Sequence, residues 1–284
     1  VGVVDIATKE EDIVTHFLVT NAHSDLLFFT DFGKVYQLKM YEIPEGKRAT
    51  KGKSIMNFLA LAGDEKVTSI LPVPKGAALD ASSVVFVTEQ GAAKRVAAKS
   101  FVDVRRSGII AINLKKGDKL VSANLSGEGD TVSIVTAKGQ SIRFDGEEVR
   151  EMGRTAGGVR GMSVKKGDRV VSAEVISALG VKDAYLLVIM SKGYGKRTKI
   201  SEYKVQGRGG SGIKTANMTP KTGEIIGARV FVGDLKEEEL VVVSKKGQVI
   251  RTSVAEIPSL SRATQGVRVM RLYPGDSIAS MVAL

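Results

Sequence analysis

Residues 240–270, LVVVSKKGQVIRTSVAEIPSLSRATQGVRVM, contain the pattern that recurs along the whole chain. A short apolar run at 240–243 and an alternating run at 249–254 flank the turn sequence SKKG. Short β-branched runs on either side of a turn signal predict a β-hairpin. The alternation is then lost in residues 255–265, which form a basic loop without aromatic residues, and a further strand is expected after Gly266.

The same unit occurs five times. Its turn glycine recurs at nearly regular intervals, and a second glycine follows each turn glycine at a nearly constant spacing. A third turn, Gly-Asp or Gly-Glu, then leads into another apolar run, so that each copy is expected to contain about four strands. The turn glycines are Gly33, Gly91, Gly139, Gly193 and Gly247, and the second glycines are Gly52, Gly108, Gly158, Gly212 and Gly266.

A period of about 50 residues with four short strands is typical of radially repeated β-sheet, in which neighbouring copies bury each other's apolar faces. We therefore predict one all-β, propeller-like domain over residues 1–284. The expected blade repeats are 21–73, 82–125, 130–176, 184–232 and 238–284, and residues 1–20 are expected to be the tail of an upstream blade. The alternative is a row of separate small β domains, but only a few residues join the copies.

Composition excludes several classes of protein. The chain has 284 residues, of which 43% are hydrophobic and 5% aromatic, so the core must be aliphatic. There is no cysteine, which excludes disulfides, cysteine zinc clusters and thiol chemistry. No apolar run reaches the eighteen residues of a membrane span, and a cytoplasmic protein is expected. His16 and His23 are the only histidines, and neither a metal, a cofactor nor an active site is expected.

Charge indicates a polyanionic partner. Lys and Arg number 42 against 31 Asp and Glu, a net charge of +11. The loop before each second glycine is basic and contains no acidic residue: GKRATKGK at 46–53, VRRSG at 104–108, GRTAGGVR at 153–160, GRGGSGIK at 207–214 and SRATQGVR at 261–268. Acidic residues recur instead at the third turn, as Asp64, Asp118, Asp168, Glu224 and Asp276.

An arginine stands four positions before the second glycine in four of the five copies. If equivalent loops occupy equivalent places, these arginines form a basic belt. Such a belt is expected to contact the phosphate backbone of duplex DNA and to bend the duplex. Single-stranded binding is disfavoured because the loops lack aromatic residues. A merely solvated surface is the alternative for any single arginine. The candidate DNA-binding residues are Lys47, Arg48, Lys51, Lys53, Arg105, Arg106, Arg154, Arg160, Lys196, Arg197, Arg208, Lys214, Arg262 and Arg268.

Several stretches carry a family resemblance, notably NAHSDLLFFTDFGKVYQLKMYEIP at 21–44, GVRGMSVKKGDRVVS at 158–172 and GYGKRT at 193–198. With the [ST]-x-x-G-x-x-x-R hairpin and the R-x-x-x-G loop, the chain resembles the C-terminal domain of bacterial type II topoisomerase A subunits, those of DNA gyrase and topoisomerase IV. The gyrase pattern is the better match.

The resemblance implies a β-pinwheel, a disc of about six four-stranded blades that wraps double-stranded DNA around a basic rim. Here it implies five complete blades plus the tail of an upstream one. In gyrase this wrapping directs ATP-dependent negative supercoiling, so the implied partners are DNA, the B subunit of the holoenzyme and the other A-subunit domains. The implied location is the nucleoid of a bacterial cytoplasm. The strand-cleaving tyrosine of the family belongs to an upstream domain.

The family's gyrase box, QRRGGKG, belongs to the first blade and is expected upstream of Val1, which would make this chain a fragment. A similar segment lies in the fourth copy and consists of Gln206, Gly207, Arg208, Gly209, Gly210, Ser211 and Gly212. It is either a degenerate box or a further copy of the basic loop. A functional alternative for the whole chain is a propeller that binds proteins on its flat faces, and such binding would respond little to salt.

Overall fold

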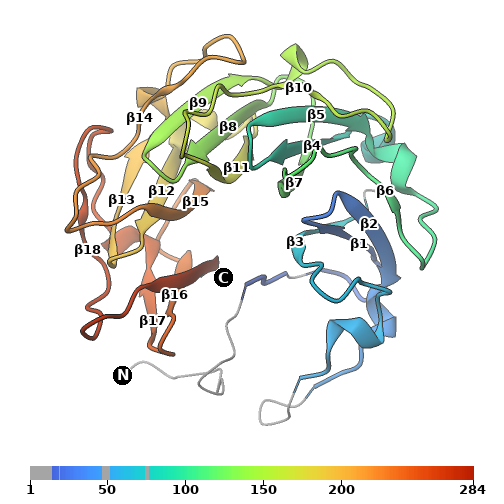
Figure 1. The fold of residues 1–284 in the computed structure, drawn as a ribbon, viewed down its shortest axis with the longest axis horizontal. Coiled ribbons are helices and arrows are strands. Elements are labelled where there is room, and N and C mark those ends of the chain that lie inside the picture. The colour runs from blue at the N-terminus through green and yellow to red at the C-terminus, as the bar shows by residue number, and fades with distance from the viewer. Residues whose placement is uncertain (1–14, 19, 47–51, 74–76) are drawn as a thin grey trace.

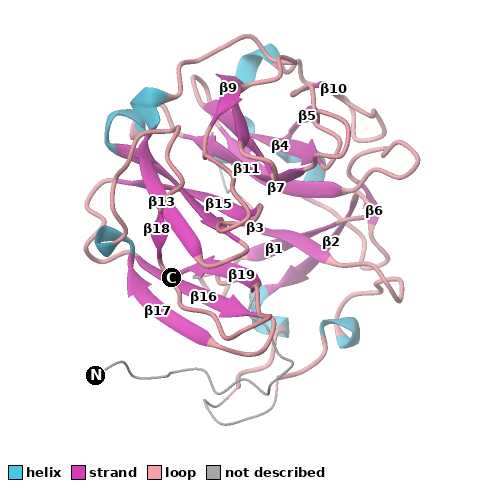
Figure 2. Cartoon of the chain, turned by 60° about the vertical axis from the view of Figure 1, so that its left-hand side comes forward, coloured by secondary structure: helices cyan, strands magenta, loops and turns pink. Residues whose placement is uncertain are grey.

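The computed structural model describes residues 15–18, 20–46, 52–73 and 77–284. Five β-sheets are arranged around a centre, which confirms the predicted propeller-like, all-β disc (Figure 1). The helices are short pieces that flank the strands (Figure 2). The predicted tail of an upstream blade, residues 1–20, lies mostly outside the described residues. None of the helices in the described ranges is long and apolar enough to cross a membrane.

From the centre outward, the strands of the five sheets are as follows. The first sheet is β3 (Val67–Pro72), β1 (Asp25–Thr30), β2 (Lys34–Lys39) and β6 (Ile109–Ile110); the second is β7 (Leu120–Ser126), β4 (Ser83–Thr88), β5 (Ala92–Ala97) and β10 (Val159–Arg160); the third is β11 (Val170–Ile176), β8 (Thr131–Thr136), β9 (Gln140–Asp145) and β14 (Ile213–Lys214); the fourth is β15 (Ile225–Val232), β12 (Ala184–Met190), β13 (Tyr194–Lys199) and β18 (Val267–Arg268); the fifth is β19 (Ile278–Ala283), β16 (Glu239–Ser244) and β17 (Val249–Ser253).

The helical pieces mostly follow the hairpins. They are the α-helix α1 (Ala77–Asp80) and the 3-10 helices η1 (Met40–Glu42), η2 (Ile55–Asn57), η3 (Ala98–Phe101), η4 (Gly146–Glu148), η5 (Val181–Asp183), η6 (Ile200–Glu202) and η7 (Val254–Glu256).

The outermost strand of the first four sheets comes from the following repeat. β6 belongs to the second repeat but pairs antiparallel with β2 of the first, Lys34 opposite Ile110 and Val35 opposite Ile109. β10, β14 and β18 join β5, β9 and β13 in the same way. Four strands per copy were predicted, but not that the third one leaves its own sheet. The fifth sheet has three strands in the described residues, because in the other sheets the fourth is supplied by the next repeat.

The second glycine of a repeat lies directly against the hairpin of the repeat before it. Gly212 has a φ of +73°, and a Cβ at this position would lie 2.5 Å from the carbonyl oxygen of Ser141. Gly266 has a φ of +79°, and its Cβ would lie 2.6 Å from the carbonyl oxygen of Gly195. Any other residue would be strained in this left-handed region and would also clash. The regular glycine spacing of the sequence is therefore a requirement of packing between repeats.

Apolar side chains of neighbouring repeats share the same core clusters. Phe29 of the first repeat packs edge to face against Phe86 and Phe101 of the second, at centroid distances of 5.3 and 5.7 Å. Val85 of the second repeat shares a cluster with Ile134 of the third, and both side chains are buried. The blades thus bury one another's faces, as the repeat period predicted.

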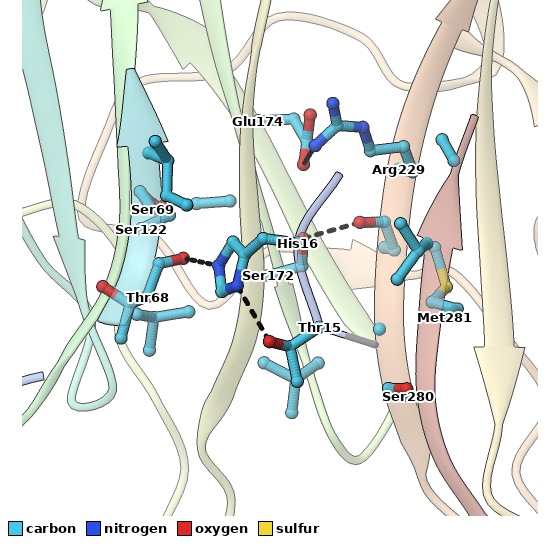
Figure 3. A pocket seen from close by; sticks show the side chains of 18 of the residues that line it. Thr15, His16, Thr68, Ser69, Ser122, Ser172, Glu174, Arg229, Ser280 and Met281 are labelled. Atoms are coloured by element: carbon cyan, nitrogen blue, oxygen red, sulfur yellow. Dashed lines mark hydrogen bonds and ion pairs between the residues drawn. The ribbon is translucent and has the colours of Figure 1, made fainter. Parts of the chain in front are cut away.

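The inner strands β3, β7, β11, β15 and β19 surround a central cavity of about 390 Å³, which Thr15–Leu18 also line (Figure 3). Polar side chains connect these strands across the sheet boundaries. The backbone N–H of Ala123 donates to Ser69 Oγ at 2.9 Å, and Ser172 Oγ donates to the carbonyl oxygen of Ala228 at 2.7 Å. The imidazole Nε2 of His16 lies 2.9 Å from the carbonyl oxygen of Thr68. The cavity is therefore lined by polar groups that hold the inner strands together.

Glu174 is the carboxylate of this cavity, and its side chain is 16% exposed. Burial raises the pKa of Glu174 to about 7, although Arg229, whose Nη1 lies 3.6 Å from Glu174 Oε1, and a backbone hydrogen bond at Val230 act in the opposite direction. The folded chain therefore keeps the proton of Glu174 up to a higher pH than the unfolded chain does.

The packing of the second glycine predicts that Gly212→Ala destabilises the fold by about 2–4 kcal/mol, because the new Cβ meets the Ser141 carbonyl in a left-handed conformation. Gly207→Ala in the same loop is the matched control, since no heavy atom lies within 4 Å of its Cβ position. It should change stability by about 0.5 kcal/mol or less. Urea unfolding measures both free energies, and equal losses would contradict the packing described for Gly212.

The raised pKa of Glu174 predicts that the stability of the fold decreases as pH rises from about 4.5 through 7, because the unfolded chain releases the proton first. Glu174→Gln removes this contribution. The variant should equal the native chain in stability near pH 4 and exceed it by about 1–3 kcal/mol at pH 8. Urea unfolding at both pH values measures the difference, with exposed Glu128→Gln as the control. A difference that is independent of pH would show that Glu174 does not titrate in this way.

Candidate nucleic-acid interface

The basic segments lie along the outer edges of the sheets, which is also where Figure 1 shows β6, β10, β14 and β18. Each runs from the second hairpin strand of its own repeat to the two-residue strand that joins the preceding sheet. We call residues 102–108, 149–158, 203–212 and 257–266 the rim loops; the equivalent segment before Gly52 lies mostly outside the described residues. The topology therefore brings the rim loops of successive repeats to the same side of successive blades, as the belt hypothesis requires.

Of the eleven predicted cations that lie in the described residues, seven are exposed. Exposed residues are Lys53, Arg105, Arg106, Arg160, Arg208, Lys214 and Arg268; partly buried residues are Arg154, Arg197 and Arg262; Lys196 is buried; and Lys47, Arg48 and Lys51 lie outside the described residues. Arg106 forms an ion pair with Glu42, which reduces the positive charge at that loop.

Arg208 and Arg262 are held by the same contacts in successive repeats. Nη1 of Arg208 donates to the carbonyl oxygen of Arg160 at 3.1 Å, and Nη1 of Arg262 donates to that of Lys214 at 3.0 Å. Their backbone N–H groups donate to carboxylates of the preceding repeat, at 2.9 Å for Arg208 to Glu148 and 3.1 Å for Arg262 to Glu202. Each guanidinium is therefore anchored with part of its donor set, and Arg208 remains exposed.

Glu148 and Glu202 are residues of this surface that sequence reasoning missed. The basic segments beside the second glycines are free of acidic residues, but these two carboxylates of the preceding repeats accept backbone N–H groups of the rim loops. Glu148 and Glu202 occupy the same position in the third and fourth repeats, counted from the turn glycines Gly139 and Gly193. That equivalence is the signal that could have found them.

Lys196 and Arg197 differ from the other predicted DNA contacts, because both side chains donate hydrogen bonds to the fifth repeat. Lys196 is 0% exposed, and its ammonium is fully used in hydrogen bonds to the loop of the fifth repeat. Arg197 Nε donates to the carbonyl oxygen of Ile257 at 2.5 Å, and its guanidinium lies 5.0 Å from the ring centroid of Tyr185. The hairpin motif that supplied these residues sits between adjacent blades, where a cation bonds to the neighbouring loop instead of facing solvent.

The box-like segment occupies a rim-loop position. The backbone N–H of Gln206 donates to the carbonyl oxygen of Arg143 at 2.8 Å, and that of Gly209 donates to the carbonyl oxygen of Gly161 at 2.6 Å. The fifth repeat contains the same type of contact, from Leu260 to Arg197 at 2.8 Å. Either reading of the segment, a degenerate box or a further rim loop, is compatible with this position and stays a prediction.

The third-turn carboxylates are directed to the hairpin turns. Asp118 Oδ1 accepts the backbone N–H of Gln90 at 3.0 Å, and Asp168 Oδ1 accepts that of Lys138 at 2.9 Å. Asp276 Oδ1 accepts that of Lys246 at 3.2 Å. These three carboxylates cap the turns of their own repeats, and this contact accounts for them without reference to a ligand. Glu224 instead pairs with Arg169 of the preceding repeat, with Oε2 and Nη1 3.0 Å apart.

A second basic group surrounds Tyr194, and of its cations the sequence singled out only Arg268. Lys221 Nζ and Arg268 lie 5.6 and 5.7 Å from the centroid of its ring, and Lys192 and Arg271 line the same hollow. The hydrogen bond from Arg268 is the main cause that lowers the pKa of Tyr194. Lys192, which precedes the turn glycine Gly193 in the sequence SKGYG, is the residue from which this basic group could have been predicted.

Other sites are less developed. Across the described parts of the chain, no group of three or more His, Cys, Asp or Glu could hold a metal ion. The central cavity contains the Glu174–Arg229 pair and hydroxyl groups, of which Ser172 Oγ is bonded to a neighbouring strand. The rim loops are therefore the candidate functional site.

Comparison with known proteins agrees with this architecture. The family model described as DNA gyrase C-terminal domain, beta-propeller, matches residues 24–74, 82–126, 130–177, 184–231 and 238–284. The DNA gyrase A subunit of Mycolicibacterium smegmatis is 40% identical over 282 residues, a match that covers 99% of this chain and 32% of the relative. The chain thus spans about a third of the length of the curated relatives it matches.

Two solved structures have the same fold. The crystal structure of the C-terminal domain of DNA topoisomerase IV has a TM-score of 0.83 and 26% identity, and the match covers 99% of this chain and 85% of that one. The structure of the DNA gyrase A C-terminal domain has a TM-score of 0.76 and 24% identity, with coverage of 95% and 89%.

Proposed function

Because the chain belongs to the family of DNA gyrase C-terminal domains, we propose that it is a non-catalytic domain that binds duplex DNA along its rim loops and bends it around the disc. The observation that carries the proposal is the repetition of basic, acid-free segments beside the second glycines, at 104–108, 153–160, 207–214 and 261–268, along the outer edges of successive blades. One basic loop would be an ordinary surface feature. Equivalent loops on successive blades match the extended, regular charge of a DNA backbone.

The chemistry of the loops supports phosphate contacts rather than base recognition. Arg160, Arg208 and Lys214 are exposed, and the loops between them are rich in glycine and other small residues, which leave backbone N–H groups accessible. Such contacts position a duplex without reading its sequence. Because the loops follow a curved edge, a duplex that touches several of them must bend, and the deformability of the DNA would supply any preference.

In a longer protein, we infer that this chain directs the path of DNA for the remaining domains. Its curated relatives are DNA gyrase A subunits of which it spans about a third, so the proposed partners are the B subunit of the holoenzyme and the other A-subunit domains. The chain would present wrapped DNA to an ATP-dependent strand-passage reaction that introduces negative supercoils. The relatives are bacterial, which supports a location on the nucleoid in the cytoplasm.

A second candidate is the equivalent domain of topoisomerase IV. The specific observation in its favour is the solved topoisomerase IV domain, whose TM-score of 0.83 exceeds the 0.76 of the gyrase A domain. The sequence match of 40% to a gyrase A subunit favours the first candidate.

Charge reversal at the rim should weaken DNA binding. Arg160→Glu with Lys214→Glu removes two exposed cations at equivalent positions whose side chains form no hydrogen bond to another repeat in the described residues. The plot of log K against log salt has a negative slope, and each lost phosphate contact should make it less steep by about 0.9. Duplex affinity at low salt should fall at least about tenfold. Fluorescence anisotropy with a labelled duplex over a salt series measures both quantities.

The control is Lys182→Glu with Lys236→Glu, an equal change of charge at exposed positions in the connections between inner and hairpin strands. It should cost much less affinity than the rim pair. Equal losses would show that only net charge matters. Binding that hardly changes with salt would favour the protein-interaction alternative.

Wrapping has its own signature in DNA topology. When singly nicked plasmid is ligated around increasing amounts of the chain, the linking number should shift progressively, because bending with a defined hand traps writhe. The rim pair Arg160→Glu and Lys214→Glu should reduce the shift at equal protein, whereas the control pair should not. Gel separation of the topoisomers measures the result. Duplex binding without a shift would mean that the chain holds DNA but does not wrap it.

A further inference from the structure

Two lysines are buried at equivalent places in the hairpins of the second and fourth repeats. Lys94 and Lys196 stand at the same distance from their turn glycines, Gly91 and Gly193, and both are 0% exposed. Lysine is almost never fully buried unless its charge is compensated, because transfer of an ammonium group out of water is unfavourable. These two residues therefore require an explanation beyond the pattern of the strand.

Both ammonium groups are compensated by the rim loop of the next repeat. Lys196 Nζ donates to the carbonyl oxygens of Ser261 and Arg262, both at 2.6 Å, and to Thr264 Oγ1 at 3.2 Å. These three bonds use all three of its protons. The lysine is thus bonded to the backbone of the segment that carries the rim arginine.

Lys94 repeats this arrangement in the second repeat. Its Nζ donates to the carbonyl oxygen of Ala111 at 2.9 Å and also to that of Arg154, the arginine of the third rim loop. No hydrogen bond joins either lysine to a carboxylate in the described parts of the structure. The charge of Lys196 is balanced by oxygen dipoles of the loop, and that of Lys94 by one loop carbonyl and by the carbonyl of Ala111 in its own repeat. The position of each ammonium and the shape of the loop above it therefore depend on each other.

Other repeats show that the fold does not need a lysine here. The equivalent residues are Tyr36, Ile142 and Ile250. The loop above Ile142 is the glycine-rich segment 207–212, and Arg208 fixes it with Nε to the carbonyl oxygen of Glu148 at 2.9 Å and Nη1 to that of Arg160 at 3.1 Å. An isoleucine at this position is compatible with the blade, so the buried lysines serve the loops above them.

We propose that Lys94 and Lys196 are positioning residues for DNA binding, whose ammonium groups hold the backbone of the third and fifth rim loops so that Arg154 and Arg262 meet the phosphate backbone. The proposal rests on the proposed function of the rim. Neither lysine touches DNA. Each acts by ordering a loop before binding, which lowers the entropy lost when the complex forms.

Titration provides a property that a purely structural role would not have. Burial lowers the pKa of both lysines to about 8, with Arg154 adding to the effect at Lys94. At Lys196 the nearby Glu202 acts in the opposite direction and Arg262 in the same one. Between pH 8 and 10.5 the unfolded chain holds these protons and the folded chain does not, so this contribution to stability rises with pH. As the two lysines lose their protons above about pH 8, their hydrogen bonds to the loop carbonyls weaken, and DNA affinity should fall.

The test is Lys94→Ile with Lys196→Ile, which introduces the residue that the third and fifth repeats already have. At pH 7 the duplex affinity should fall about 3- to 10-fold through loss of loop order. The Tm should be unchanged or higher, because a buried charge is replaced by an apolar side chain. Between pH 7 and 9 the native chain should lose affinity while the variant loses much less. Tyr194, whose pKa is lowered by the hydrogen bond from Arg268, is present in both chains, so the comparison cancels its effect.

The matched control is Lys99→Ile with Lys199→Ile, which removes two exposed lysines at the ends of the same two hairpins. It should keep the pH profile of the native chain. The proposal would be overturned if Lys94→Ile with Lys196→Ile bound duplex DNA with the affinity and pH profile of the native chain. The proposed function of the rim would still stand. A marked loss of Tm would also overturn the proposal, because the lysines would then serve the fold. A native chain that binds no duplex at any pH would overturn the rim function itself.

Discussion

The exchange of one short strand between repeats is the constraint on which the rest of the structure depends. A sheet made from a single repeat would have only three strands and an unpaired outer edge, which is a site for unwanted association. In this chain the next repeat covers that edge with two residues, such as Val159–Arg160 on Ala92 and Ala93. The chain must then travel from its own hairpin to the neighbouring sheet, and that path is the rim loop. The loops lie on the outside of the disc because the exchanged strand is the outermost one.

This origin explains why the loops have a defined shape without being regular structure. Their amides bond to the neighbouring second hairpin strand, as Met152 does to Arg95 at 2.9 Å and Leu260 to Arg197 at 2.8 Å. Their glycines lie on the same strand with positive φ, and Arg208 reaches back to the carbonyl of Arg160. Each loop is thus shaped by the repeat that precedes it. Cations on a surface that is already ordered lose little conformational entropy when they bind a phosphate.

Charge is divided between the two ends of this arrangement. Carboxylates such as Asp118 and Asp168 bond to the hairpin turns of their own repeats, whereas the basic segments beside the second glycines contain none. Acidic residues that do lie near the loops, Glu148 and Glu202, are occupied by loop amides. A positive outer edge results without a large loss of stability from clustered cations, because several of the cations near it have carbonyl partners.

The sequence alone determined the repeat, the all-β class, the hairpins and the basic loops, because these follow from local patterns: glycines at turns, alternation in strands and charge in the segments between them. Tertiary structure decided which repeat each strand joins and which cations face solvent. Strand exchange depends on pairing between segments of different repeats, such as Lys34 with Ile110, and a local pattern carries no information about it. For the same reason the sequence predicts Lys196 and Arg208 equally as DNA contacts. In the structure Lys196 is buried under the rim loop of the next repeat, whereas Arg208 is exposed on its own rim loop. The difference arises from the neighbouring repeat, whose position only the folded chain defines.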